Sequence, residues 1–148
     1  MSDLSKNEYL KKLMPALSNL YRAMATSRDT FLAQFNLSRP QLELLIFLKK
    51  KPCSTRTIAK EFAVSSSSVT QMIDQLIQKN LVTRKVDLND KRVQLITLSE
   101  NGAILFEEIQ AKYFERLETK FEMVSSDEIK ILLNEITKIS QNIAKEYK

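Results

Sequence analysis

The sequence predicts a mainly α-helical protein, and three of its features lead to this fold class. Only one Gly and three Pro occur among the 148 residues, too few for an all-β sandwich or barrel or a glycine-rich nucleotide-binding fold. Apolar residues make up 43% of the chain and charged residues 28%, a mixture typical of a single globular domain. Apolar residues also recur at steps of three and four over long stretches, which is the spacing of one helix face.

Two helices are expected in the first third of the chain. The first covers residues 8–33, where the apolar spacing is helical although Pro15 removes a hydrogen bond from the early turns. Ser38 and Gln41 have the spacing of a capping box, which opens the second helix. Three lysines followed by Pro52 favour its end, because cations suit a helix C-terminus and proline disfavours continuation.

Two shorter helices and a hairpin are expected next. Residues 55–62 form the first of these helices, and the four serines at 65–68 begin another that runs to about Asn80. Asparagine tolerates the left-handed conformation that often follows a helix. Residues 81–86 and 93–98 are rich in β-branched side chains and flank a polar segment, which predicts a β-hairpin with a charged tip.

Two further helices complete the predicted elements. Ser99 is expected to cap a long helix, and Ser125 and Glu128 have the spacing of another capping box before the last helix. The last helix carries an apolar stripe that consists of Ile129, Leu132, Leu133, Ile136, Ile139, Ile143 and Tyr147. Together with the stripe of the first helix, this is more apolar area than a compact lobe can cover, which predicts an obligate dimer. The residues expected at dimer contacts are Leu10, Leu13, Leu17, Leu132, Ile136, Ile139 and Ile143.

Missing residue types exclude several activities. The chain has no His and only one Cys, so it lacks the means for a His-based triad, a His-containing zinc site or an internal disulfide. Its single Gly excludes the glycine-rich phosphate loops. The longest apolar run, residues 44–48, is too short to span a membrane, and the first residues do not resemble a signal peptide. We therefore expect a cytoplasmic protein that is not an enzyme and has no cofactor, no metal and no membrane partner.

Charge is distributed unevenly along the chain. Residues 1–54 carry a net charge of +5, residues 55–92 carry +3, and residues 93–148 carry −3. A basic first part followed by an acidic last part fits a polyanion bound by one region only. A lysine-rich surface exposed to solvent explains the same charges equally well.

The helix expected at residues 65–80 has one apolar and one polar face. Val69, Ile73 and Leu76 lie within one arc of it. The opposite face carries Ser67, Thr70, Gln71, Asp74, Gln75 and Gln78. Such a helix fits the major groove of double-stranded DNA, and the following hairpin can place cations beside the minor groove. The order of elements is that of a winged helix–turn–helix, while an amphipathic core helix with an ordinary polar outside is the alternative.

Four stretches of this region carry a family resemblance. Residues 58–76 form the predicted helix–turn–helix, and Asn80-Leu81-Val82-Thr83-Arg84 leads from it into the hairpin. Asp87-x-x-Asp90-Lys91-Arg92 and Leu98-Ser99-x-x-Gly102 follow. These motifs resemble the helix–turn–helix, wing and post-wing signatures of the MarR family of bacterial transcription regulators. The resemblance implies a homodimer with interlocked first and last helices, whose two winged lobes each read half of a pseudo-palindromic operator.

The resemblance also implies a division of the chain. Residues 1–148 form a single MarR-like domain, in which 38–98 is the winged DNA-binding lobe and 1–37 with 99–148 is the helical dimerisation region. The residues expected to contact DNA are Arg39, Thr55, Arg56, Ser66, Ser67, Ser68, Thr70, Gln71, Gln75, Arg84, Lys91 and Arg92. Gln71 and Gln75 stand where the family commonly has basic residues, so more of the electrostatic affinity is expected from the cations of this set.

An acidic residue in the recognition helix needs an explanation, because it repels phosphate unless it is neutralised locally. The resemblance implies that Asp74 pairs with Arg92 and holds the wing against the helix, and that Asp90 orients the same guanidinium. The alternative is that Asp74 is a solvated charge on a polar face.

Four residues near helix starts have two interpretations. Ser54, Thr55 and Ser65 are expected to cap helices, and contact with DNA phosphate is the alternative. Cys53 is expected to be a small half-buried apolar side chain rather than a thiol activated by nearby cations.

The aromatic residues bear on a possible effector. Tyr21, Phe31, Phe35 and Phe47 are expected to pack in the core, and the alternative is that they border a cavity for a small aromatic or other apolar effector. The sequence therefore predicts a DNA-binding transcriptional repressor that acts as a homodimer and is released by a small ligand. A helical protein-interaction adaptor that kept the winged fold without binding DNA is the alternative.

Overall fold

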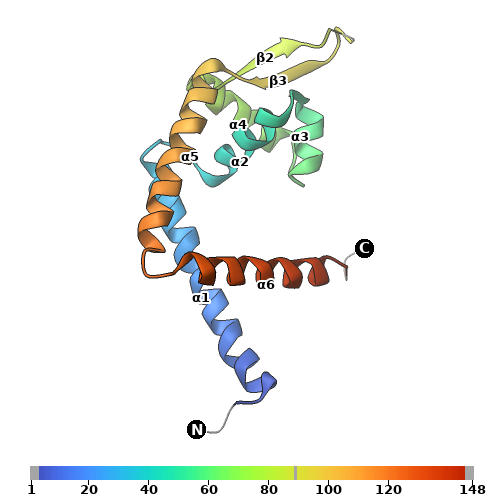
Figure 1. Cartoon of the computed structure of the whole chain (residues 1–148). Coiled ribbons are helices and arrows are strands. Elements are labelled where there is room, and N and C mark those ends of the chain that lie inside the picture. The colour runs from blue at the N-terminus through green and yellow to red at the C-terminus, as the bar shows by residue number, and fades with distance from the viewer. Residues whose placement is uncertain (1–3, 89, 146–148) are drawn as a thin grey trace. The chain divides into compact units, whose positions relative to one another are not determined.

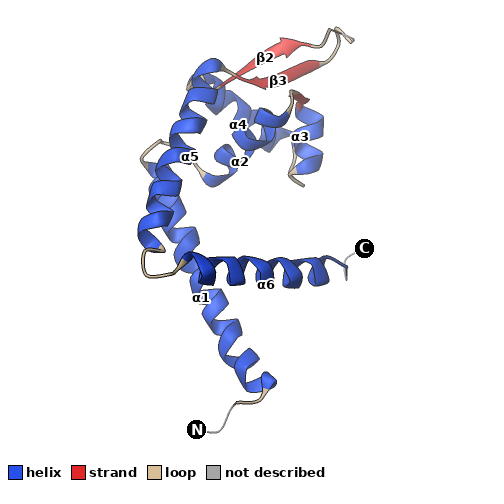
Figure 2. Cartoon of the chain, viewed as in Figure 1, coloured by secondary structure: helices blue, strands red, loops and turns tan. Residues whose placement is uncertain are grey.

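A computed structural model describes residues 4–88 and 90–145. The chain divides into two compact units, residues 1–107 and 108–148, and the two are described separately. Most of the described residues are helical, and a small antiparallel sheet is the exception (Figure 2). The predicted fold class, a mainly helical winged helix–turn–helix, is confirmed.

The first unit begins with two helices, α1 (Lys6–Ala33) and α2 (Arg39–Lys50). Helix α1 starts two residues earlier than predicted, because Ser5 and Glu8 form a capping box that the sequence analysis did not include. Pro15 is accommodated inside α1. The predicted capping box of Ser38 at the start of α2 is confirmed.

The helix–turn–helix consists of α3 (Thr55–Glu61) and α4 (Ser66–Gln78). The side chains of Ser54 and Ser65 accept hydrogen bonds from backbone N–H groups in the first turns, so their predicted capping roles are confirmed. In the turn between the helices, Ala63 adopts a φ of 52°, and Asn80 after α4 adopts the predicted left-handed conformation with a φ of 56°. Figure 1 shows α2, α3 and α4 gathered below the hairpin.

The sheet contains β1 (Cys53–Ser54), β2 (Val82–Val86) and β3 (Gln94–Leu98) in the order β1-β3-β2, with both pairs antiparallel. Val82 pairs with Leu98, and Val86 pairs with Gln94. Strands β2 and β3 each begin one residue later than predicted. Leu81 lies outside β2 because its N–H donates to the Leu76 carbonyl and closes the end of α4.

The core of the first unit lies where α2, α3 and α4 meet the sheet. Helices α2, α3 and α4 bury apolar side chains there, and each strand contributes at least one more. Its side chains with at most 4% exposure include Leu44, Leu45, Leu48, Cys53, Ile58, Val69, Ile73, Leu76, Val82 and Ile96. This core sets the position of α4 and thereby decides which of its residues face outward.

Helix α5 (Glu100–Lys120) begins in the first unit. Ser99 Oγ accepts a hydrogen bond from the Gly102 N–H at 2.9 Å, which confirms the predicted cap. The same hydroxyl donates to the Asn80 carbonyl at 2.6 Å. The start of α5 is therefore tied to the turn that joins α4 to the wing.

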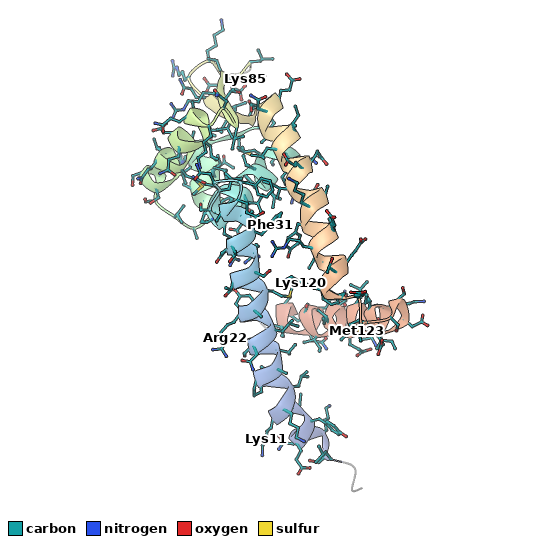
Figure 3. The ribbon with its side chains drawn as sticks, turned by 90° about the vertical axis from the view of Figure 1, so that its left-hand side faces the viewer. Lys11, Arg22, Phe31, Lys85, Lys120 and Met123 are labelled. Carbon is teal, nitrogen blue, oxygen red and sulfur yellow. The ribbon has the colours of Figure 1, made fainter. Side chains whose placement is uncertain are left out.

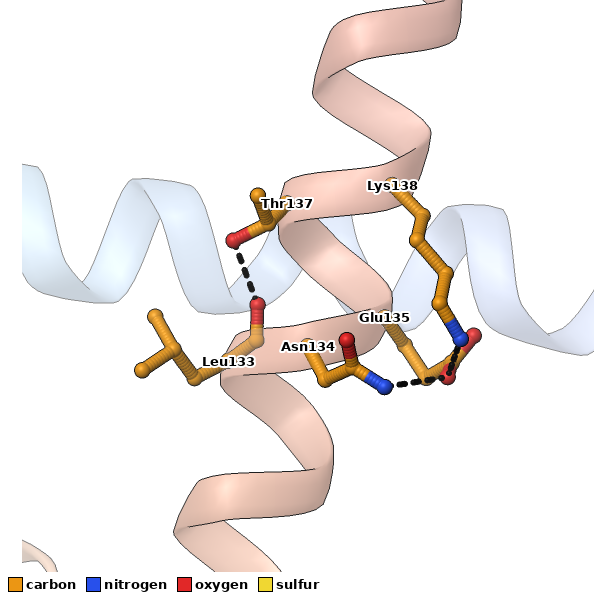
Figure 4. Close-up of polar contacts among 5 residues, drawn as sticks. All are labelled: Leu133, Asn134, Glu135, Thr137 and Lys138. Carbon is orange, nitrogen blue, oxygen red and sulfur yellow. Dashed lines mark hydrogen bonds and ion pairs between the residues drawn. The ribbon is translucent and has the colours of Figure 1, made fainter.

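The second unit contains the rest of α5 and α6 (Ser126–Lys145). The capping box of Ser125 and Glu128 is confirmed. On α6, Thr137 donates to the Leu133 carbonyl and Lys138 pairs with Glu135 (Figure 4). Tyr147, the last residue of the predicted stripe, lies outside the described residues. Among those that are described, no helix combines the length and apolar composition needed to cross a bilayer.

Candidate nucleic-acid interface

Helix α4 presents a polar face to solvent, as its sequence pattern predicts. Val69, Ile73 and Leu76 are completely buried, and this orientation leaves Gln71 and Asp74 exposed on the other side. Exposed groups that both donate and accept hydrogen bonds suit the edges of bases in the major groove.

Hydroxyl groups gather at the N-terminus of α4. Ser65 Oγ accepts from the Ser68 N–H at 3.1 Å and shares hydrogen bonds with the hydroxyls of Ser67 and Ser68 at 2.9 and 2.8 Å. Thr70 Oγ1 donates to the Ser66 carbonyl at 2.9 Å. A hydroxyl has one donor and two acceptor sites, so the three bonds of Ser65 use its full capacity, whereas the hydroxyls of Ser67, Ser68 and Thr70 can each take a further partner.

Gln75 differs from Gln71 in its contacts. Its Oε1 accepts a hydrogen bond from Nε2 of Gln41 at 2.9 Å, across the interface between α4 and α2. Gln41 is 6% exposed, and its contact with Gln75 is additional to the capping role predicted for it. The sequence spacing could have predicted that Gln41 is buried, because it lies three and four residues before the apolar Leu44 and Leu45, on the same face of α2.

Asp74 pairs with the wing, but its partner differs from the prediction. Arg84 Nη2 lies 2.6 Å from Asp74 Oδ1, and Arg92 makes no salt bridge within the described part of the chain. The predicted Asp74–Arg92 pair is therefore wrong. The reason is position: Arg84 is on β2, which packs against α4, whereas Arg92 belongs to the turn at the far end of the hairpin.

Asp90 likewise acts on backbone rather than on the Arg92 side chain. Its Oδ1 accepts the N–H of Arg92 at 2.9 Å, so it stabilises the turn, and its predicted contact with the guanidinium does not form. The side chains of Lys91 and Arg92 are exposed beside it. Lys85, which the sequence analysis did not select, is also exposed on the wing (Figure 3). The sequence feature that could have identified Lys85 is its position next to Arg84 on a strand of the predicted hairpin.

Candidates on α2 and α3 are held in different ways. Arg39 Nε pairs with Glu43 Oε1 at 2.8 Å, and this hydrogen bond raises the pKa of Arg39. Thr55 is half-buried in the first turn of α3, and Arg56 next to it is exposed. Ser54 Oγ accepts from the Thr57 N–H at 3.2 Å and is therefore used for capping.

Cys53 and the aromatic residues mostly pack. Cys53 is 4% exposed, and burial raises the pKa of its thiol, the opposite of activation. Phe31 is 2% exposed, and its ring meets that of Phe35 edge-on, with 5.1 Å between the ring centroids. The Phe47 ring makes a similar edge-on contact with Phe62 at the end of α3. Tyr21 is 64% exposed, so its predicted place in the core is wrong. The reason is that α1 buries side chains only near its C-terminal end, at Phe31 and Leu32, and Tyr21 lies about three turns before them.

No group of three or more Cys, Asp and Glu side chains in the described ranges is arranged to hold a metal ion. The site instead consists of a helix with a hydrogen-bonding face, a hairpin with exposed cations and an ion pair that joins them. These are the parts of a winged helix–turn–helix protein that binds DNA.

Comparison with known proteins agrees with this class. The model of the MarR family matches residues 37–94. The HTH-type transcriptional repressor MdtR of Bacillus subtilis is 31% identical over 108 residues, which cover 72% of this chain and 70% of the relative. The HTH-type transcriptional regulator MhqR of the same organism is 25% identical over 134 residues, 88% of this chain and 91% of that protein. The chain belongs to the MarR family of transcriptional regulators, proteins that bind DNA and are not enzymes.

Solved structures show the same fold. The YusO protein from Bacillus subtilis superposes with a TM-score of 0.82 at 26% identity, covering 93% of this chain and 99% of that one. A point mutant of S. aureus MepR, solved bound to an oligodeoxyribonucleotide, has a TM-score of 0.66 at 22% identity and covers 95% of this chain and 99% of that one.

Proposed function

We propose that this regulator is a repressor that binds a two-fold-related DNA operator as a homodimer in the cytoplasm. The observation that carries the proposal is the exposed hydrogen-bonding face of α4 beside a wing with exposed cations. Repression is supported by the similarity to MdtR, which is a transcriptional repressor. Binding to a duplex is supported by the oligonucleotide complex of MepR.

Each predicted DNA-contacting residue has a place in this proposal. Gln71 and Gln75, both exposed on α4, read base edges in the major groove. Lys91 and Arg92 lie at the tip of the wing and contact phosphate or the minor groove. The remaining set contacts the backbone of the duplex and positions the helix: Arg39, Thr55, Arg56, Ser66, Ser67, Ser68, Thr70 and Arg84.

Asp74 serves this arrangement through the wing. Because its carboxylate is bonded to Arg84, the negative charge is neutralised where α4 would approach phosphate. The pair also links the recognition helix to β2. Residues 38–98 are the DNA-binding lobe in this proposal.

Dimerisation is supported by exposed apolar faces on the remaining helices, residues 1–37 and 99–148. Leu10, Leu13 and Leu17 on α1 are between 41% and 45% exposed. On α6 the exposed fractions are 48% for Leu132, 54% for Ile136, 49% for Ile139 and 51% for Ile143. Exposed apolar faces of this kind mark a protein–protein interface, and a second copy of the chain would cover them. A symmetric dimer also supplies the two lobes that a two-fold operator requires.

A small apolar effector that releases the repressor completes the proposal. Its support comes from a structure of S. aureus MarR in complex with salicylate and kanamycin, which has a TM-score of 0.76 at 20% identity and covers 94% of this chain and 95% of that one. Of the four aromatic residues considered for this role, Tyr21 on α1 is the most exposed, at 64%, whereas Phe31 is buried.

Selection of bound sites from random duplex DNA tests the proposed function. We expect the full chain to enrich a motif whose two halves are related by a two-fold axis, spaced by about one helical turn or a multiple of it. Enrichment of no motif, with binding to DNA no tighter than that of an unrelated basic protein, would contradict it. That result would favour the protein-interaction adaptor.

A further inference from the structure

Gln41 is the only buried polar side chain among the residues that the structure describes. It lies in the first turn of α2, beneath the recognition helix, and its side chain contacts three other residues: Ser38, Gln75 and Lys79. Buried amides must satisfy their donors and acceptors, so these contacts fix which way the group is turned.

Two of the partners can only donate. Gln41 Oε1 accepts from the backbone N–H of Ser38 at 3.1 Å and from Lys79 Nζ at 3.3 Å. Lys79 Nζ also donates to the Asn36 carbonyl, which anchors it at the end of α1. Because neither a backbone N–H nor an ammonium can accept, the oxygen of Gln41 must face them.

The nitrogen of Gln41 must then face the other way, toward α4. There Nε2 donates to Gln75 Oε1 at 2.9 Å. This bond turns the oxygen of the Gln75 amide toward α2 and leaves its NH₂ as the group directed outward to a partner. A glutamine without such a contact turns its amide freely and bonds both N6 and N7 of adenine.

We propose that Gln41 is a positioning residue that sets the base preference of Gln75. With its oxygen turned toward Gln41, Gln75 presents only its NH₂ to the groove, and it favours guanine, which offers two acceptors at N7 and O6, over adenine. This inference rests on the proposed DNA-binding function and adds to it a residue that does not touch DNA. Gln71, whose amide has no hydrogen bond within the described residues, keeps both hydrogen-bonding modes.

The substitution Gln41→Glu separates this role from a structural one. A carboxylate still accepts from Ser38 and Lys79, and Glu serves as well as Gln in a capping box. It cannot donate to Gln75, so the Gln75 amide turns, bonds the carboxylate through its NH₂ and presents its oxygen outward. Site selection with the variant is expected to shift one base pair in each half-site from guanine toward a base with an amino group, by about tenfold.

Two measurements accompany the selection. In the double variant with Gln75→Ala, Gln41→Glu should cause no further change at that base pair. Side-chain NH₂ exchange measured by NMR on the wild-type chain without DNA should be slower for Gln41 than for Gln75, and in Gln41→Glu the Gln75 NH₂ should become protected. Because the wild-type measurement requires no variant, it tests the proposal even if Gln41→Glu fails to fold.

The outcomes distinguish this inference from the proposed function. If wild type enriches a motif but Gln41→Glu leaves its base preferences unchanged, the inference is overturned and the proposed function stands. Faster exchange at Gln41 than at Gln75 overturns it as well, and so does a preference at the base pair assigned to Gln75 that survives Gln75→Ala. If wild type enriches no motif, the proposed function fails, and this interpretation of Gln75 fails with it.

Discussion

At the scale of single residues, the two arginines of the wing, Arg84 and Arg92, differ in whether a carboxylate neutralises their charge. Arg84 is bonded to Asp74, and an exposed ion pair of this kind contributes only about 0–1 kcal/mol to stability. Arg92 has no carboxylate partner within the described ranges, so its charge is available to a polyanion. The two arginines should therefore affect DNA binding differently.

Arg92→Ala is expected to weaken binding by a similar factor at every DNA sequence. Because the proposed dimer loses one phosphate contact in each protomer, the slope of log affinity against log salt should also become less steep by about 2. Fluorescence anisotropy titrations over a range of salt concentrations measure both effects. Arg22→Ala is the matched control, because Arg22 lies on α1, away from the wing (Figure 3). Equal slopes for wild type and Arg92→Ala would exclude a DNA contact by Arg92.

Gln71→Ala should act on specificity rather than on overall affinity. If the Gln71 amide bonds a base, its loss should relax the preference at one base pair in each half-site by about 1–3 kcal/mol and leave the salt slope unchanged. Quantitative binding to a set of singly substituted operators provides the measurement. The control is Gln78→Ala, which removes the same amide from the last turn of α4. Uniform weakening at all sequences would instead assign Gln71 a backbone contact.

At the scale of elements, one glycine controls how closely α5 approaches the wing. A Cβ at Gly102 would lie 2.1 Å from the Leu81 carbonyl oxygen and 2.9 Å from Leu98 Cδ1. The same carbonyl oxygen accepts the N–H of Ser99 at 3.0 Å. It therefore cannot move aside without weakening the bond that joins the start of α5 to the end of α4.

Gly102→Ala should destabilise the protein although alanine favours helix by about 1 kcal/mol over glycine. We expect a loss of roughly 1–3 kcal/mol in the free energy of unfolding, because overpacking forces the backbone apart. Denaturant unfolding followed by circular dichroism gives the value. Asn101→Ala, at the exposed neighbouring position, should cost little. An unchanged or raised stability of Gly102→Ala would show that α5 does not require this close approach.

At the scale of the whole molecule, α1 and α6 each carry an apolar face that is about half exposed in the single chain. The polar side of α6 satisfies itself locally, as the pair of Lys138 with Glu135 shows (Figure 4). Its apolar side is open to solvent: Ile136 is 54% exposed and Ile139 is 49% exposed. Burial of each such side chain is worth about 1.5–3 kcal/mol.

Ile136→Glu is therefore expected to dissociate the dimer, since a buried carboxylate without a partner is unfavourable. Light scattering at micromolar concentration should give twice the chain mass of 17.1 kDa for wild type and a lower mass for the variant. Asn134→Glu introduces the same side chain on the opposite face of α6 and should leave the mass unchanged. A wild-type mass of one chain would rule out the proposed dimer.

Interactions within a few residues could be predicted from sequence alone. The capping boxes of Ser38 and Ser125 and the left-handed Asn80 are set by neighbours one to three positions away, so spacing suffices to find them. The polar face of α4 followed from the 3.6-residue period, and the hairpin from its β-branched runs. The family resemblance extended this to the class of protein.

The partners of individual polar groups were decided only by the tertiary structure. Asp74 and Arg84 are ten residues apart, and Gln41 and Gln75 are 34 apart. No periodicity specifies such pairs, because they depend on how β2 and α2 pack against α4. The sequence therefore determined that α4 carries an amide-rich polar face, while the packing of α2 beneath it decided which of its amides is already bound.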